Sequence, residues 1–194
     1  QADRRFRQGR PQDGAGEFCA AGVRMTNDAR AIANLILDTA ENRGIEISNA
    51  AIQKVLYFSF GHYAAEFQDY LFEDRIEAWE YGPVVRDIYN QFKQFGWRPI
   101  LERATVIDFR TGAKRVAEYA LDPARLGFLS TVIEFYSPIP VGKLIELSHL
   151  RDSPWDRAWN HSSVTNPGME ISKSEIRRYF QTSWSVPGAQ LGRA

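Results

Sequence analysis

Ser59, His62 and Glu66 are the side chains whose types and spacing come nearest to a hydrolytic set. A serine nucleophile, a histidine base and an acid could together cleave an ester or amide bond. On a helix these residues fall at i, i+3 and i+7, which places them on one stripe. Hydrolases instead take nucleophile and base from different elements, and the serine stands on a sharp G-x-S-x-G turn that this sequence lacks. We therefore interpret the three as a semi-polar seam and predict no catalytic residues, with a hydrolase kept as an alternative.

Ligands for metals and phosphates are sparse as well. The three histidines, His62, His149 and His161, are scattered and show no H-x-x-x-H spacing. Cys19 is the only cysteine, which leaves no disulfide framework and no thiolate cluster and fits a reducing cytoplasm. Neither a Walker loop nor a G-x-G-x-x-G turn is present. The sequence therefore predicts no metal site, no cofactor and a cytoplasmic location.

The stretch 52–67 carries these three side chains, and it is apolar around most of a helical turn. One broad arc of the helix is apolar, and Phe58 lands near the opposite side. The arc consists of Ile52, Leu56, Phe60, Tyr63, Ala64 and Phe67. A bilayer span needs about 20 mostly apolar residues, whereas this stretch is shorter and is interrupted by Lys54. We predict that it is the central helix of a domain, with other elements packed around it.

Caps and breakers predict the surrounding elements. Asp28 and Ser48 stand where helices can begin, and the first of these helices ends at Arg43-Gly44. Alternation of apolar residues predicts one hairpin over 103–121, and further helices follow Asp122-Pro123, Pro140, Pro154 and Ser172. The predicted fold is α+β, mainly α: a compact bundle of about six helices around the helix at 52–67, with one small β-hairpin.

Charge and composition bound both the domain count and the partners. The 194 residues carry 24 basic and 24 acidic side chains, so the formal charge is zero. Nucleic-acid binding needs a clustered excess of cations, which argues against nucleic acid as the main partner. Residues 1–24 show no apolar periodicity and no secretory signal, so we expect a flexible extension there, a single globular domain over 25–183, and a tail over 184–194.

The segment from Ile76 to Tyr81 alternates apolar and polar residues and is predicted to be extended. Gly82-Pro83 breaks it, and Pro83 fits the first turn of a new helix that ends near Phe95-Gly96. Tryptophans are often binding hot spots because they bury a large area with few rotors. The five tryptophans all lie near loops or element ends: Trp79, Trp97, Trp155, Trp159 and Trp184. For Trp155 and Trp159 we favour packing against the core.

Several blocks together resemble the Panacea domain, the family of SocA-like antitoxins and phage-associated GepA-like proteins. They are Q-K-V-L-Y-F from Gln53 with Gly61 and Tyr63, E-A-W-E-Y-G-P-V-V from Glu77 with Tyr89 and Phe92, L-S-H from Leu147 with S-P-W from Ser153 and Ala158-Trp159, and Ile176 with Tyr179-Phe180. The resemblance runs from about residue 28 to residue 181. The second block, followed by S-H-x-x-x-S-P-W-x-x-A-W, is its most specific part.

This resemblance implies a mostly helical antitoxin that neutralises a cognate toxin by direct binding. For the SocA branch it also implies an adaptor that delivers the toxin to a Clp-type protease. It implies no catalytic residues and no separate DNA-binding domain. We assign the toxin surface to Trp79, Tyr81, Gly82, Pro83, Val84 and Val85, and a structural motif to Tyr57, His149, Trp155 and Trp159. A phage-associated nucleic-acid-binding protein is the other alternative, and it predicts salt-sensitive retention on DNA.

Overall fold

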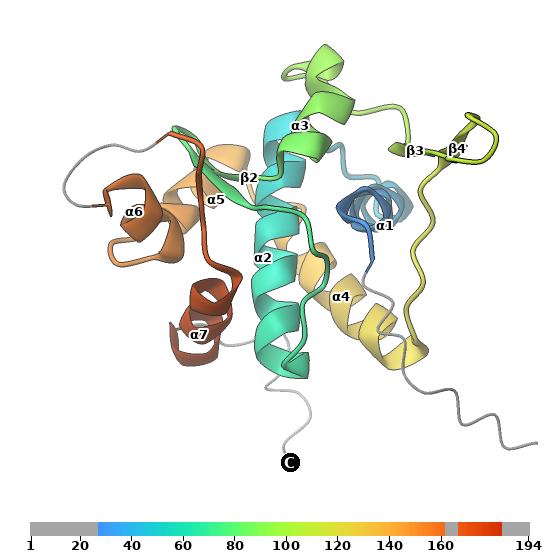
Figure 1. Ribbon diagram of the computed structural model, residues 1–194. Coiled ribbons are helices and arrows are strands. Elements are labelled where there is room, and N and C mark those ends of the chain that lie inside the picture. Colours follow the sequence, from blue (N-terminus) through green and yellow to red (C-terminus); the bar gives the residue numbers. More distant parts are fainter. Residues whose placement is uncertain (1–26, 162–166, 184–194) are drawn as a thin grey trace, which may run out of the picture.

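The computed structural model describes residues 27–161 and 167–183 (Figure 1). The extension predicted at 1–24 and the tail predicted at 184–194, which includes Trp184, lie outside these residues. The described elements are α1 Ala29–Asn42, α2 Asn49–Phe67, β1 Glu77–Trp79, β2 Gly82–Val84, α3 Arg86–Phe92, the short 3-10 helix η1 Lys93–Phe95, β3 Thr105–Ile107, β4 Lys114–Val116, α4 Pro123–Tyr136, α5 Val141–Ser148, α6 Pro154–Trp159, β5 Met169–Glu170 and α7 Lys173–Ser183.

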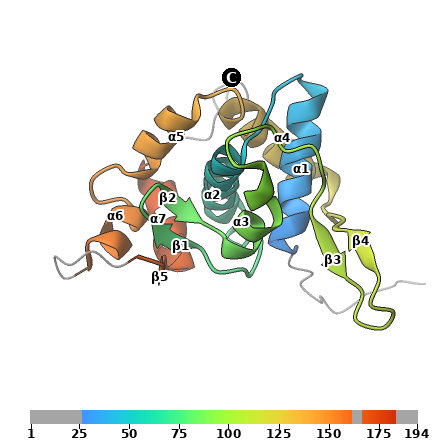
Figure 2. The same ribbon diagram turned by 90° about the horizontal axis from the view of Figure 1, so that it is seen from above.

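Helix α2 lies in the middle of the molecule, and α1, α3, α4, α5 and α7 pack around it (Figures 1 and 2). It begins after Ser48, whose Oγ accepts a hydrogen bond from the Ala51 N–H, and it ends at Gln68 in the left-handed conformation. Side chains on every side of α2 are buried, including Phe58 opposite the apolar arc. The predicted central helix and the mainly helical α+β class are therefore confirmed, with α2 beginning at Asn49 instead of Ile52.

Side-chain caps start several of the other helices, as the sequence predicts. The carboxylates of Asp28 and Asp122 accept hydrogen bonds from the N–H groups of Arg30 and Arg125, at 2.8 and 3.0 Å. Ser153 caps α6 in the same way, so the single turn predicted at 155–159 is a short helix. The described residues thus hold seven α-helices, close to the six predicted. None of them is long and apolar enough to cross a membrane.

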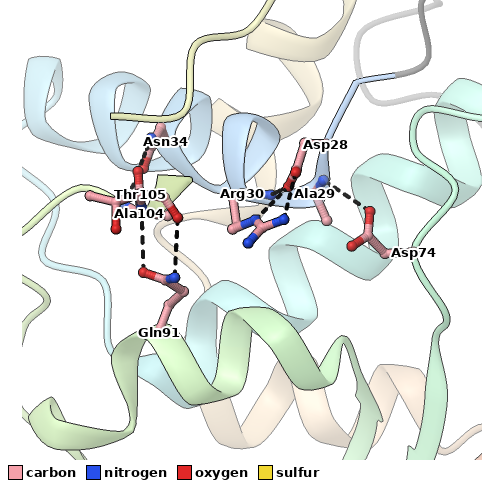
Figure 3. A network of polar contacts seen from close by, with 8 residues as sticks. All are labelled: Asp28, Ala29, Arg30, Asn34, Asp74, Gln91, Ala104 and Thr105. Carbon is pink, nitrogen blue, oxygen red and sulfur yellow. Dashed lines mark hydrogen bonds and ion pairs between the residues drawn. The ribbon is translucent and has the colours of Figure 1, made fainter. Parts of the chain in front are cut away.

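Helices α1 and α3 are each tied to the base of the β3–β4 hairpin by one amide side chain that imitates backbone pairing (Figure 3). The Asn34 amide accepts from the Ala104 N–H at 2.7 Å and donates to the carbonyls of Ala104 and Ala117. Gln91 of α3 pairs with both the N–H and the carbonyl of Thr105. Both amides are thereby satisfied at their nitrogen and their oxygen, and they fix the base of the hairpin.

The predicted hairpin over 103–121 is present with shorter strands. Thr105 pairs with Val116 and Ile107 with Lys114, so pairing covers 105–107 and 114–116 only. The hairpin projects beyond α1 (Figure 2), and Phe109 near its tip is fully exposed. Neither face of the hairpin packs on the core near its tip, so no burial there fixes where the strands end. The alternation of residue types therefore predicted that the hairpin exists but not how long its strands are.

The structure corrects the prediction for Gly82-Pro83 and for the number of strand pairs. Gly82 and Pro83 belong to β2, which pairs with β1 in an antiparallel hairpin, and α3 begins only at Arg86. Gly82 has φ +100°, a conformation that favours glycine and lets the chain reverse after Tyr81. Strand β2 lies at the edge of a three-stranded sheet of order β2-β1-β5, where a proline without an N–H is tolerated.

Candidate functional site

The structure does not assemble Ser59, His62 and Glu66 into a hydrolytic site. Ser59 and His62 are buried in the core, whereas Glu66 is exposed near the end of α2. His62 Nε2 lies 2.9 Å from the hydroxyl of Tyr136, and the Ser59 hydroxyl has no hydrogen-bond partner among the described residues. Burial lowers the pKa of His62 to about 4, so its ring is neutral at pH 7. The arrangement is that of a packed helix seam.

We expect acid to destabilise the protein through His62. In the unfolded chain this histidine binds a proton near pH 6.5, but the native side chain resists protonation down to about pH 4. The unfolded state therefore holds more protons in this window, and native stability falls as the pH falls, by about 1–3 kcal/mol. Urea unfolding at both ends of the window should show a smaller loss in His62→Gln. An equal loss in His62→Gln and in the parent protein would contradict this role.

A pocket of about 420 Å³ lies between the start of α2, the β1–β2 hairpin, α3, η1 and α5. Four aromatic side chains from the stretch 79–97 help to form it, together with three buried polar residues of α2. It is lined by Asn49, Ala50, Gln53, Lys54, Trp79, Glu80, Tyr81, Val84, Tyr89, Lys93, Gly96, Trp97 and Ile145. We call it the aromatic pocket.

Two of its aromatic side chains are more than half exposed to solvent, Tyr89 is 37% exposed, and Trp79 is held in place. Tyr81 is 61% exposed and Trp97 is 75% exposed, whereas Trp79 is half-buried. The Trp79 indole donates a hydrogen bond to Glu77 at 2.9 Å, and the Arg86 guanidinium lies 5.5 Å from the centre of its ring. The wall contributed by Trp79 is therefore fixed, and the exposed rings of the rim can bury a large area against a partner.

Glu77 anchors this wall from beneath. Its carboxylate binds Arg86 through two hydrogen bonds, at 2.7 and 3.1 Å. Burial acts to raise the pKa of Glu77, but the hydrogen bonds from Arg86 and Trp79 outweigh it and hold that pKa below its usual range. The carboxylate is therefore ionised at neutral pH and keeps Trp79 and Arg86 in register.

Lys54 lies at the base of the pocket and is almost completely buried, with 2% of its surface exposed. Its Nζ donates to the carbonyl of Pro83 at 3.0 Å. A Cβ on Gly82 would lie 2.8 Å from Lys54 Cε and 2.6 Å from Ser148 Oγ, so only glycine leaves room for this approach. Burial lowers the pKa of Lys54 to about 7, which makes a neutral amine accessible at physiological pH.

The surface predicted at 79–85 is divided between the pocket and the layer behind it. Trp79, Tyr81 and Val84 line the pocket, and Gly82, Pro83 and Val85 are buried. The buried members set the course of the hairpin: Pro83 offers its carbonyl to Lys54, and the Val85 N–H donates to Gln53 at 2.9 Å.

Three of the four residues predicted as a structural motif, His149, Trp155 and Trp159, form one stack next to β1, whereas Tyr57 lies on α2. His149 stacks on Trp155 with 3.6 Å between ring centres, and Trp155 stacks on Trp159. The Trp155 indole donates to the carbonyl of Trp79 at 2.9 Å, which links α6 to the wall of the pocket. Tyr57 is buried against Phe58 and Phe180. The Trp155 indole therefore braces the pocket from behind, whereas Tyr57 belongs to the core between α2 and α7.

Sequence reasoning did not place the polar base of the pocket. Asn49, Gln53 and Lys54 are buried on α2, although their types favour exposed positions. The available signal was the i, i+4 spacing of Asn49 and Gln53 directly after the Ser48 cap, which puts two amides on one face. Within the described ranges, no three His, Cys, Asp or Glu side chains gather as metal ligands.

Comparison of the sequence with known proteins assigns the chain to a family. The model of the family "Antitoxin SocA-like, Panacea domain" matches residues 52–156, from α2 into α6. The chain belongs to this family. It is also similar to Antitoxin SocA of Caulobacter vibrioides (strain NA1000 / CB15N), with 32% identity over 164 residues that cover 82% of this chain and 87% of the relative. No solved structure gives a significant match. The predicted resemblance is therefore confirmed, and the matched region includes most of the aromatic pocket.

Proposed function

We propose that this protein is an antitoxin that neutralises a cognate toxin by direct binding, and that the aromatic pocket is the centre of the binding surface. Family membership and the similarity to Antitoxin SocA support the antitoxin role. The observation that carries the location is the convergence of Trp79, Tyr81, Tyr89 and Trp97 on one pocket. Protein interfaces concentrate their binding energy in such aromatic clusters, where one partner inserts an anchor into a pocket on the other.

The size and the rigidity of the pocket suit this role. A volume of about 420 Å³ accepts one large side chain with part of its backbone. Its walls are preorganised by Glu77, by Trp155 and by the Lys54–Pro83 hydrogen bond, so little conformational entropy is lost when a partner binds. The protein acts by occupying a surface of the toxin, and its own side chains make or break no covalent bond.

We expect Trp79→Ala and Tyr81→Ala to weaken the toxin complex by about 10- to 100-fold each, because each removes a large aromatic surface from the centre of the interface. The toxin is expected to be a small protein encoded beside this chain. Co-expression in a toxin-sensitive host would measure protection, and titration of the purified pair would measure the Kd.

Phe109→Ala is the matched control for this experiment. It removes an aromatic ring that is fully exposed, but on the β3–β4 hairpin, away from the pocket. We expect it to leave the Kd within about twofold. Folded Trp79→Ala and Tyr81→Ala variants that protect cells fully would exclude the aromatic pocket as the toxin surface.

A finer version of the proposal follows from the SocA branch of the family. In that version the bound toxin is delivered to a Clp-type protease in the cytoplasm, and this chain is the adaptor. The toxin half-life should then shorten when the chain is present and recover in a host without the protease. An unchanged half-life together with full protection would leave direct binding as the whole mechanism.

A further inference from the structure

Two amide side chains at the base of the aromatic pocket are only half satisfied. Asn49 Nδ2 donates to the carbonyl of Tyr89 at 3.2 Å, and Gln53 Oε1 accepts from the Val85 N–H. Their other atoms, Asn49 Oδ1 and Gln53 Nε2, have no hydrogen-bond partner among the described residues. Asn34 and Gln91, by contrast, use both ends of their amides. Among the buried amide groups of the described residues, unpaired atoms thus occur only at the pocket, although four other buried atoms, the hydroxyls of Tyr57, Ser59 and Ser137 and Nε2 of His149, also lack a partner.

The backbone decides which atom of each amide is left over. Tyr89 presents a carbonyl, so Asn49 must turn its NH₂ towards it and keep its oxygen as a spare acceptor. Val85 presents an N–H, so Gln53 must turn its oxygen towards it and keep its NH₂ as a spare donor. A buried polar atom without a partner is costly, and each such case calls for an explanation.

Lys54 adds a buried cation without a matching anion. Its ammonium has three donors, and one of them goes to Pro83. No carboxylate of the described residues forms an ion pair with it, and burial alone accounts for its altered pKa. Among the described residues that line the pocket, the other charged side chains are Lys93 and Glu80, which are exposed. The base of the pocket therefore offers donors from Lys54 and Gln53 and an acceptor from Asn49.

We propose that the aromatic pocket binds the carboxy-terminal residue of the partner protein, with its α-carboxylate on Lys54 and Gln53 and its backbone N–H on Asn49. A chain end is the unit that carries an anion and an N–H donor two bonds apart on one residue. A chain end can also reach a cation at the base of a pocket because the chain stops there. An internal residue would need the chain on both sides of it to pass over the rim. An apolar terminal side chain would then lie against Trp79, Tyr81 and Trp97. This inference rests on the proposed function, because it names the chemistry by which that surface recognises the toxin.

N-acetyl-leucine is a suitable probe, because it reproduces a chain end with one amide, one free carboxylate and an apolar side chain. Titration into isotope-labelled full-length protein, followed by two-dimensional NMR, should shift the side-chain amides of Asn49 and Gln53 and the indole signals of Trp79 and Trp97. A fragment of this size should bind with a Kd on the order of 1 mM. N-acetyl-leucinamide, which lacks the charge, should bind at least about tenfold more weakly.

Lys54→Met and Lys114→Met form a matched pair, since each removes one positive charge, and Lys114 is exposed on β4, outside the pocket lining. Binding should be lost in Lys54→Met and kept in Lys114→Met. If Lys54→Met does not fold, the parent protein gives the same test, because binding should strengthen as the pH is lowered to about 6 and Lys54 gains its proton. Equal loss in both variants, or binding that ignores pH, would overturn the proposal.

Acetyl-aspartate methylamide carries its carboxylate on a side chain and has a blocked chain end. It therefore distinguishes binding of a terminal carboxylate from binding of an acidic side chain. It should bind much more weakly than N-acetyl-leucine, and equal binding would replace the chain end by an internal acidic residue. If no probe shifts these signals, the proposal of a carboxylate site is excluded, but the proposal of toxin neutralisation is not affected. Neutralisation has its own test in the Trp79→Ala and Tyr81→Ala variants, so the two failures are distinguishable.

Discussion

Gly61→Ala is expected to destabilise the protein by about 3 kcal/mol, a large part of the stability of a domain of this size. Gly61 lies in the middle of α2, where the Phe180 ring of α7 packs directly on the helix backbone. A methyl group at this position would overlap the ring atoms Cδ2, Cε2 and Cζ. The ring cannot swing away freely, because it also packs against Tyr57, Phe58 and His62. The change must therefore push α7 away from α2.

Gly127→Ala is the control for this prediction and should have the opposite sign. Gly127 also lies within a helix, α4, but a methyl group there would meet nothing within 4 Å. Alanine at such a position favours the helix by about 0.5–1 kcal/mol. Urea unfolding of both variants would separate a packing effect from a general effect of glycine replacement. A second change, Phe180→Leu, should recover part of the loss in Gly61→Ala, and two independent, additive effects would contradict direct contact.

The parts of the fold that local chemistry determines were predictable from the sequence. The caps at Asp28, Ser48 and Asp122 act on N–H groups two or three residues ahead, so a short window of sequence contains the whole interaction. The burial of α2 was also predictable, because no polar stripe wide enough to face water runs along it. The order of the α-helices therefore followed from residue pattern alone.

Gly82-Pro83 shows why other parts were not predictable. A proline after a glycine fits a helix start as well as an edge strand, and the local sequence does not choose between them. The choice is made by distant partners: Gln53 binds Val85, Lys54 binds Pro83, and β5 pairs with β1 from a position about 90 residues away. Periodicity cannot detect such contacts.

The polar base of the aromatic pocket was missed for a related reason. A lysine within an apolar helix is ordinarily assigned to a solvent-facing gap, and in the sequence Lys54 indicates only an interruption of the apolar stretch. Its burial depends on the carbonyl that β2 places above it and on the space that Gly82 leaves. The aromatic candidates Trp79 and Tyr81 were recognisable from residue type, whereas the amides and the amine beneath them required the tertiary structure.

Stability should rise between about pH 7 and about pH 10, and Lys54 is the reason. The native pKa of this lysine is lowered to about 7, against 10.5 in the unfolded chain. Between these values the unfolded state holds a proton that the native state has released, so raising the pH favours the native state. The gain should reach about 2–4 kcal/mol. Burial raises the pKa values of Tyr57 and Tyr136, which destabilises the native state only above about pH 10.

Lys54→Met tests this assignment, since methionine fills a similar volume and carries no titratable group. Its unfolding free energy, measured by urea denaturation across the same pH range, should change little. Near pH 7 the variant should lose the hydrogen bond to Pro83 but also the cost of burying a charge, two effects that oppose each other. His149, which lies near enough to sense the charge of Lys54, titrates below this window because burial lowers its pKa. Lys93→Met should retain the full alkaline gain, and a gain that survives in Lys54→Met would show that another group is responsible.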